Sequence, residues 1–411
     1  MGPLAGIRVL DLTRVLAGPW ASQLLADYGA DVVKVEEPTG GDDSRKWGPP
    51  WLTDAGGAAT SESAYFLCAN RGKRSVTLDL AHPQGAALAR RLALGSDVLL
   101  ENFKVGGLAR FGLDYATLAP LHPALIYCSI TGFGQDGPDA ARPGYDAMIQ
   151  AMGGLMSITG VPEGEPGAGP QKVGVAVSDL MAGMYAATAV LAALVERARS
   201  GRGQHIDLAL LDTQLSWLAN QGMNYLLTGR APQRLGSAHP SITPYQPFAS
   251  ADGFVMVAVG NDRQFAGLCR AAGCPALAAD SRFASSAARV EHRAALTEEL
   301  APLLRLRSTQ DWVRELGAAG VPCGPINDIA QAFAEPQVRH RQMQLTLPHP
   351  LTGTVPQVAN PTRFSRTPVE YRRAPPLLGE HTDEVLGERL GLAAGELAAL
   401  RAAGAFGTPR R

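Results

Sequence analysis

IRVLDLTRVLAGPWASQLLADYGADVVKVE, residues 7–36, decides the fold of this chain. Residues 7–12 are rich in leucine and β-branched side chains, residues 20–28 are helix formers, and residues 31–36 are again β-branched. A strand, a helix and a second strand of these lengths fit a right-handed βαβ unit. We therefore expect a mostly parallel, doubly wound sheet whose ligands bind beyond the carboxyl ends of its strands.

The same alternation continues through the first half of the chain. Further strands are expected at residues 75–80, 97–101, 125–130 and 205–210, and helices at 83–94, 115–121, 144–156, 180–200 and 212–227. The pattern changes at Thr228-Gly-Arg-Ala-Pro232, which is typical of a linker. A smaller α+β unit follows, with a strand expected at 254–259 and helices at 264–272, 289–306 and 309–316.

A chain of 411 residues exceeds one ordinary core, so we expect two domains. Residues 1–225 would form the first part of a large Rossmann-like domain, and residues 226–330 a small α+β domain. Residues 331–411 show short strands around Val355 and Phe364 and a terminal helix, but no obvious core of their own. We expect this last segment to return to the large domain.

Composition favours a globular enzyme and excludes several other classes. A net charge of −1 offers no basic field for nucleic acid. The five cysteines form no CxxC pair, which fits reduced thiols in a cytoplasmic protein and predicts no metal site. The N-terminus predicts neither a signal peptide nor myristoylation, and the most apolar window, 180–195, is shorter than the roughly 20 residues that span a bilayer. We expect no membrane partner.

The stretch Gly132-Phe-Gly-Gln-Asp-Gly137 matches the GxGxxG pattern of dinucleotide sites. Pro138 and a polar, turn-like segment follow it, so no helix N-terminus is available to receive a pyrophosphate. We therefore do not expect NAD or FAD, and no tightly bound cofactor is predicted. The basic cluster Asn70-Arg-Gly-Lys-Arg74 is either a solvated loop or a phosphate contact.

Asp179 stands where an apolar segment meets a long run of helix formers that ends at Gly201. An aspartate at a helix N-terminus is commonly a capping residue, because it accepts backbone N–H bonds there. The alternative is a carboxylate nucleophile, since a rigidly held, ionised aspartate can form acyl intermediates. Residue types and spacing alone leave both interpretations open.

Seven motifs in one order resemble the class III CoA-transferase (CaiB/BaiF) family, which includes formyl-CoA transferase, the carnitine CoA-transferases and α-methylacyl-CoA racemase. They are Gly6–Thr13, Gly29–Glu36, Asn102-Phe103, Gly144-Tyr-Asp146, Ser178-Asp179, Gly201–Gln204 and Pro376–Asp383. The resemblance implies a Rossmann-like large domain built from both chain ends, an inserted small domain, and an interlocked homodimer whose linkers near residues 225 and 330 cross between domains. It implies that Asp179 attacks an acyl-CoA thioester.

The resemblance also implies a set of coenzyme A contacts. They are Leu16, Ala17, Leu78, Leu80, Asn102, Phe103, Arg110, Tyr145 and Asp146. Glu37, Ala81 and Pro143 stand where formyl-CoA transferase has basic residues, so other cations must neutralise the CoA phosphates. Arg71, Lys73, Arg74 and Arg142 are the candidates.

The segment Arg234–Gln246, with Gly260–Arg263 and Phe333–Pro336, is similar to the succinyl-CoA:glutarate CoA-transferase branch. This resemblance implies succinyl-CoA as donor and a dicarboxylic acid as acceptor, whose distal carboxylate His239 and Ser237 could bind. The alternative is racemisation of an α-methylacyl-CoA, but the racemase histidine falls at Tyr145, and a phenol is a poor base near pH 7. A non-catalytic CoA-binding subunit is a third possibility.

Overall fold

The structure is a computed structural model that describes residues 1–54 and 56–407. The chain forms two compact units. The large unit comprises residues 1–155, 173–228 and 339–411, and the small unit comprises residues 156–172 and 229–338. The large unit is thus built from three separate segments of the chain.

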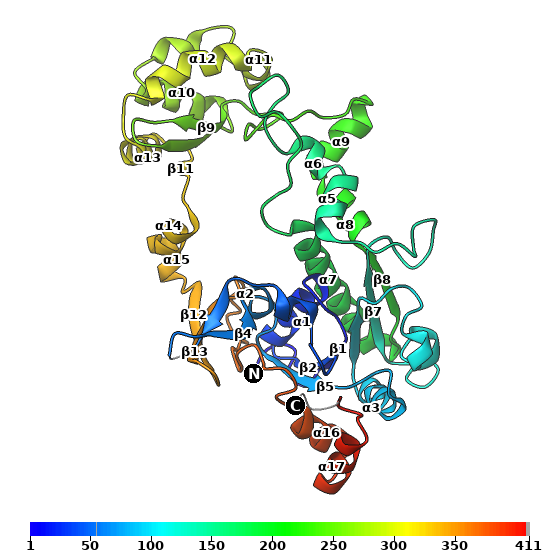
Figure 1. Cartoon of the computed structure of the whole chain (residues 1–411). Coiled ribbons are helices and arrows are strands. Elements are labelled where there is room, and N and C mark those ends of the chain that lie inside the picture. Colours follow the sequence, from blue (N-terminus) through cyan, green and yellow to red (C-terminus); the bar gives the residue numbers. More distant parts are fainter. Residues whose placement is uncertain (55, 408–411) are drawn as a thin grey trace. The chain divides into compact units, whose positions relative to one another are not determined.

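A six-stranded parallel sheet forms the centre of the large unit (Figure 1). Its strands are β1 (Arg8–Asp11), β2 (Asp31–Glu36), β5 (Lys73–Thr77), β6 (Val98–Glu101), β7 (Ile126–Thr131) and β8 (His205–Ala209). Their order is β5-β2-β1-β6-β7-β8, and every neighbouring pair is parallel. The chain therefore changes direction across the sheet between β1 and β6, which is where an open α/β sheet leaves a crevice for ligands.

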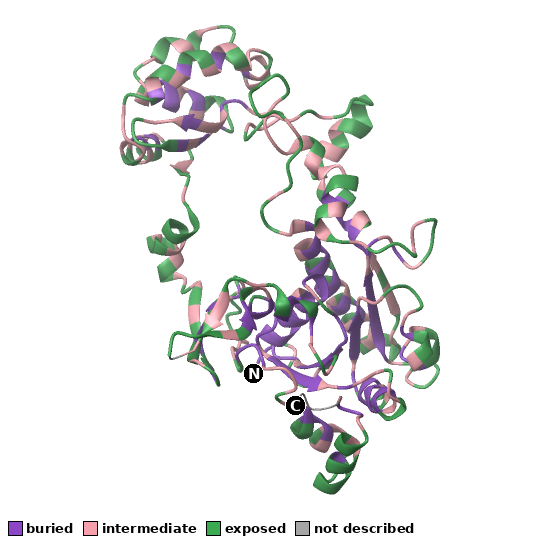
Figure 2. Ribbon diagram, viewed as in Figure 1, coloured by how far each residue is buried: buried purple, intermediate pink, exposed green. Residues whose placement is uncertain are grey.

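Helices cover both faces of this sheet, because its strands are apolar on both sides. On β6, Val98 and Leu100 face the core under α1 (Ala17–Asp27) and α7 (Val177–Ser200). Leu99 faces the core under α3 (Pro83–Leu94), α16 (Thr382–Leu390) and α17 (Ala394–Ala402). Buried residues gather along the central strands, α1 and α7 (Figure 2). The doubly wound arrangement expected from residues 7–36 is confirmed.

Helix α7 is long and apolar enough to cross a membrane by length and composition alone. Its small residues, among them Ala182, Ala186 and Val190, are instead buried against α1 and the sheet. A Cβ on Gly183 would lie 2.6 Å from the carbonyl oxygen of Ala17, so α1 and α7 touch through this glycine. The face of α7 that carries these residues is therefore part of the core of the large unit.

The remaining elements of the large unit are shorter. Antiparallel hairpins are formed by β3 (Trp51–Thr53) with β4 (Ala59–Ser63) and by β12 (Gln344–His349) with β13 (Gly353–Val358). Short helices are η1 (Asp43–Lys46), α2 (Ala64–Leu67), η2 (Ala109–Phe111), α4 (Tyr115–Leu118), α5 (Asp146–Met152), α8 (Leu210–Trp217) and α9 (Ala219–Thr228). The prediction of a single helix over 212–227 is wrong. Ala219 has a left-handed φ of 46°, and this residue separates α8 from α9. No strand forms at Phe364.

The small unit is an α+β fold around the antiparallel sheet β11-β10-β9. Its elements are β9 (Tyr245–Ala249), β10 (Phe254–Ala258), α10 (Asp262–Ala271), η3 (Pro275–Ala279), α11 (Ser286–Glu291), α12 (Arg293–Leu304), α13 (Thr309–Ala318), β11 (Cys323–Pro325) and α14 (Ile329–Ala334). Val255, Leu300 and Trp312 pack in its core, and the Trp312 indole N–H donates to the Leu304 carbonyl at 2.6 Å. Two helices, α6 (Leu155–Ile158) and α15 (Pro336–His340), cross the boundaries between units.

Candidate active site

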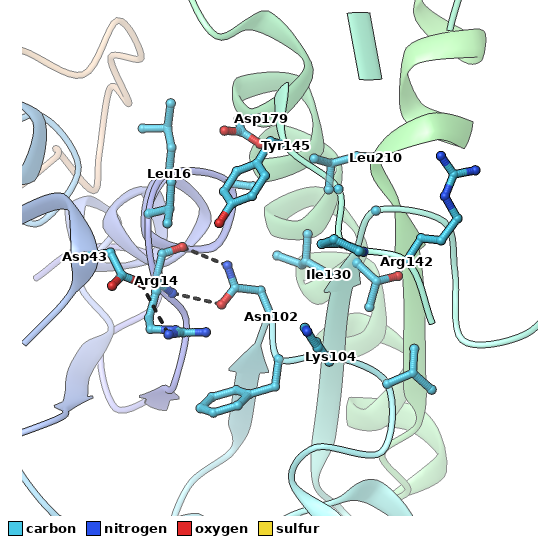
Figure 3. Close-up of a pocket in the computed structure, with 18 of the residues that line it drawn as sticks. Arg14, Leu16, Asp43, Asn102, Lys104, Ile130, Arg142, Tyr145, Asp179 and Leu210 are labelled. Carbon is cyan, nitrogen blue, oxygen red and sulfur yellow. Dashed lines mark hydrogen bonds and ion pairs between the residues drawn. The ribbon is translucent and has the colours of Figure 1, made fainter. Parts of the chain in front are cut away.

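A pocket of about 880 Å³, including space open to solvent, lies at the switch point of the sheet (Figure 3). Loops that follow β1, β6 and β7 form its walls, together with the first turns of α7 and α8. The lining residues are Arg14–Ala17, Asp43, Asn102–Val105, Ile130–Gly132, Ala140, Arg142–Tyr145, Asp179 and Leu210. Gly132 and Gly144 approach within van der Waals contact, because a Cβ on Gly132 would lie 2.6 Å from the Gly144 Cα. This close crossing returns the 132–144 loop to the pocket and presents Tyr145 there.

Asp179 lies in the first turn of α7, yet it does not cap the helix. The residue at the capping position, Ala176, has no side-chain cap bond. Asp146 of α5 serves this role from another helix, since its Oδ1 accepts the N–H of Ser178 at 2.8 Å and of Asp179 at 3.4 Å. Within the described residues no N–H is bonded to the Asp179 carboxylate. The capping interpretation of Asp179 is therefore wrong, and its carboxylate is free to face the pocket.

The Asp179 side chain has an unusual protonation state. Burial, followed by the charge of Asp146, raises its pKa to about 7, and the residue is only 8% exposed. The sequence suggests an aspartate that stays ionised, whereas this environment leaves it about half protonated at neutral pH. The anion that does form is poorly hydrated, which suits a carboxylate that must attack a carbonyl carbon.

The structure brings most of the predicted CoA contacts to one place. Leu16, Ala17, Asn102, Phe103 and Tyr145 line the pocket with Asp179. Asp146 does not line the pocket but supports the first turn of α7 that carries Asp179.

Three other predicted contacts lie outside the pocket. Leu78 is 1% exposed in the core beneath α3, and Leu80 packs against the same core. Arg110 is exposed, with its guanidinium 4.5 Å from the centre of the Phe111 ring. Their roles remain predictions.

Comparison with known proteins gives this pocket its context. Residues 4–382 match the family described as CoA-transferase family III. The chain belongs to this family. It is 52% identical, over 94% of this chain and 95% of the relative, to the succinate–glutarate CoA-transferase of Agrobacterium fabrum. It is 41% identical to the human succinyl-CoA:glutarate CoA-transferase, over 94% and 86% of the two chains.

A solved structure shares the fold. The crystal structure of a CaiB/BaiF family protein from Brucella suis is 48% identical, has a TM-score of 0.83, and covers 94% of this chain and 99% of its own. The relatives named here are CoA-transferases, and enzymes of this kind use an acyl-CoA as substrate. Among the residues that the structure describes, no three His, Cys, Asp or Glu side chains lie close enough together to hold a metal ion.

In this CoA-transferase the amide of Asn102 is already engaged. Its oxygen accepts the Arg14 N–H at 2.9 Å, and its nitrogen donates to the Arg14 carbonyl at 2.7 Å (Figure 3). The Arg14 guanidinium lies 5.2 Å from the centre of the Phe103 ring. Asn102 therefore ties the loop after β6 to the loop after β1, and its contribution to the pocket is to hold their backbones.

Three of the four cations suggested for the CoA phosphates are used inside the protein. Arg71 pairs with Asp27 at 2.6 Å, Lys73 with Asp11 at 3.1 Å, and Arg74 with Asp31 at 2.6 Å. The side chains of all three cations are 6% exposed or less. Burial lowers the pKa of Lys73 to about 8. These cations are therefore unable to reach a ligand in the pocket.

Two cations of the pocket, Arg14 and Lys104, were not predicted from the sequence. Arg14 and Lys104 both line the pocket and are exposed, as is Arg142, which pairs with Asp139 at 2.9 Å. Arg14 pairs with Asp43 at 3.3 Å, and both side chains are about half exposed. Arg14 follows the carboxyl end of β1, and Lys104 follows the carboxyl end of β6. This position after a central strand is the signal that would have found the two cations.

Tyr65 is a further neighbour of Asp179 that the sequence did not reveal. Burial, followed by the charge of Asp179, raises the pKa of Tyr65 to about 12. Its ring packs edge-on against Trp47, with ring centres 5.0 Å apart. Both residues come from the segment between β2 and β5, where no regular pattern predicts a position relative to the sheet.

The loop expected to select the acceptor belongs to the small unit. His239 Nδ1 accepts the Ser241 N–H at 3.1 Å, and its ring lies 5.3 Å from that of Tyr245. Arg293 of α12 donates to the carbonyls of His239 and Pro240. The loop is thus held at its centre, and its binding role remains a prediction.

Proposed function

We propose that this enzyme transfers CoA from succinyl-CoA to a dicarboxylic acid such as glutarate, with Asp179 as the covalent nucleophile. The observation that carries the proposal is the Asp179 carboxylate, which is buried in a pocket at the switch point and bonded to no N–H of the described residues. The names of the relatives from Agrobacterium fabrum and from human support the substrate pair.

The proposed reaction begins with attack of an Asp179 oxygen on the thioester carbonyl. The carbon–sulfur bond breaks, CoA leaves as thiolate, and Asp179 and the acyl group form a mixed anhydride. The thiolate then attacks the aspartyl carbonyl, which releases the donor acid as carboxylate and leaves an aspartyl-CoA thioester. The acceptor carboxylate repeats the two steps in reverse order. Each step exchanges one acyl bond for another, so no oxidant, reductant or water is consumed.

The pocket supports this assignment of parts. Arg14 and Lys104 bring exposed positive charge to the lining of the pocket, which suits the CoA phosphates. Tyr145 stands where a racemase would place its histidine, and a phenol is a poor general base near neutral pH. Transfer is therefore favoured over proton abstraction from an α-carbon.

The substrate class is tested by an exchange screen. The enzyme is incubated with succinyl-CoA and a panel of monocarboxylic and dicarboxylic acids, and new acyl-CoA species are identified by mass spectrometry. We expect a preference for dicarboxylates of about four to six carbons, since the relatives from Agrobacterium fabrum and from human are named for succinate or succinyl-CoA and glutarate. A preference for long-chain or aromatic monoacids would overturn the substrate class. Deuterium entering 2-methylacyl-CoA from deuterated water, without an acceptor acid, would favour racemisation.

The nucleophile is tested by Asp179→Asn. This change keeps the shape of the side chain, and we expect exchange to fall below about a hundredth of the wild-type rate. Asp212→Asn is the matched control, because Asp212 is the third residue of α8 as Asp179 is of α7, but is exposed. Trapping with hydroxylamine after acyl-CoA alone should mark the peptide that contains Asp179. A label elsewhere, or an active Asn variant, contradicts the mechanism.

We further propose that the enzyme is a cytoplasmic homodimer. The cysteines are all free thiols, which fits a reducing compartment. Helices α7, α8 and α9 leave large apolar side chains exposed, among them Leu215, Leu226 and Leu227 at 53%, 73% and 78%. Side chains of this kind gather where a second chain covers them.

A further inference from the structure

Val15, in the turn between β1 and α1, has a left-handed backbone with φ of 72°. In a β-branched residue this conformation is an outlier, because the Cβ crowds the backbone. Such strain persists only where the surroundings impose it, and it is often associated with function. Val15 lines the pocket with Arg14, Leu16 and Ala17.

A buried ion pair imposes this conformation. The Asp42 carboxylate accepts the Val15 N–H at 3.0 Å and 3.3 Å, and it also accepts the N–H and the hydroxyl of Ser44. Lys34 Nζ pairs with Asp42 at 2.9 Å and donates to the Thr13 carbonyl at 2.7 Å. The side chains of Lys34 and Asp42 are both completely buried. The Lys34–Asp42 pair thus binds the backbone of Thr13 and of Val15, the two residues on either side of Arg14.

The neighbouring residues of the turn are fixed as well. Asn102 holds both backbone groups of Arg14, and Asp11 accepts the Thr13 N–H at 2.9 Å. Asp11 is in turn paired with Lys73. A buried ion pair is weak evidence for stability, because desolvation offsets much of the attraction. What these pairs provide instead is one defined path for the backbone.

The conformation of this turn matters because the residues that follow it line the pocket together with Asp179. Helix α1 begins at Ala17, whose carbonyl touches α7 at Gly183, one helical turn beyond Asp179. Leu16 and Ala17 line the same pocket as Asp179. We propose that Asp42, held by Lys34, is a positioning residue for CoA transfer: it keeps Val15 strained and thereby sets Leu16 and Ala17 beside Asp179. This inference rests on the proposed function.

The first test is Asp42→Asn, which removes the charge that holds Lys34 and weakens the acceptor of the Val15 N–H. We expect kcat to fall at least about tenfold, while KM for acyl-CoA changes less than about threefold because the loop after β6 remains. Asp27→Asn is the matched control, since Asp27 is a buried carboxylate paired with Arg71 at the far end of α1. A kcat for Asp42→Asn within twofold of this control would overturn the proposal.

The second test separates strain from simple loss of a contact. In the Asp42→Asn background, Val15→Gly should recover at least about threefold in kcat, since glycine adopts a left-handed φ without strain. Val15→Ala should recover nothing, because alanine loses the same side-chain methyls but keeps the Cβ that causes the strain. Equal effects of the two substitutions, or no recovery with glycine, would contradict the positioning role.

A third measurement does not depend on folding of Asp42→Asn or on activity. In the otherwise wild-type chain, Val15→Gly should melt at least about 2 °C above Val15→Ala. At an unstrained position the order would be reversed, so an alanine variant that melts higher refutes the strain. If the wild type transfers CoA to no acid in the screen, the proposed function fails, while this melting order still decides whether Val15 is strained.

Discussion

The carboxylate of Asp179 has a pKa of about 7 instead of the ordinary 3.8, because it is buried and faces Asp146. A nucleophile must be ionised, so kcat/KM should rise with pH, about tenfold per unit below pH 7, and level off above it. An ordinary aspartate would give a flat profile from about pH 5 upward. The profile is measured between pH 5 and 9 with limiting acyl-CoA. Asp146→Asn, which keeps an acceptor oxygen, should shift the rise to lower pH.

The raised pKa of Asp179 also makes the stability of the folded chain depend on pH. Between pH 4 and 7 the folded chain binds a proton at Asp179 that the unfolded chain has lost, so the contribution of this group to stability falls as the pH rises. Above pH 7 the penalty is at most about 4 kcal/mol. Asp179→Asn should therefore melt above the wild type at pH 8, with the difference disappearing near pH 4. An Asn variant that melts lower at pH 8 would contradict the shift.

The contact between helices α1 and α7 depends on Gly183. A Cβ there would meet the Ala17 carbonyl oxygen at 2.6 Å and Trp20 at 3.1 Å, and a backbone atom is unable to move aside as a flexible side chain could. Gly183→Ala should therefore destabilise the protein by about 1 to 3 kcal/mol, although alanine is the better helix former. Activity should fall as well, because Ala17, whose carbonyl would be displaced, lines the pocket.

A glycine-to-alanine substitution in another helix distinguishes the steric effect at Gly183 from the effect of helix propensity. Gly387 lies within α16, and a Cβ there would make only ordinary contact, 3.6 Å from the Leu392 carbonyl. Gly387→Ala should be neutral or stabilising by up to about 1 kcal/mol. Thermal unfolding of both variants checks the pair, and a Gly183→Ala protein as stable as the wild type would show that the helices separate without cost.

For the molecule as a whole, the exposed apolar side chains of α7, α8 and α9 predict an obligate homodimer. Light scattering at micromolar concentration should give twice the chain mass of 43.1 kDa, and the melting temperature should rise with protein concentration. Leu226→Glu with Leu227→Glu should weaken the dimer, while Leu94→Glu, at an exposed leucine on α3, is the control. A folded species of one chain mass would refute the prediction.

The sequence by itself determined the architecture of the large sheet and the family. β-branched runs separated by helix formers predicted the strands and helices of the parallel sheet, because burial on both faces demands continuous apolar strands. The bounds of β2 and α3 agree with those expected, since each is delimited by glycine, proline or polar residues. The order of seven motifs identified the family, which the comparison confirmed.

Only the tertiary structure decided the chemistry around Asp179. Contacts between segments far apart in the chain decide three features. They decide which residue caps α7, which cations are held in buried ion pairs, and which turn is strained. Asp146 and Asp179 lie 33 residues apart, and Lys34 reaches Asp42 only because β2 is buried beside β1. A local pattern records the propensity of each segment, but burial and pairing arise when segments pack, and these set the pKa of Asp179 and the conformation of Val15.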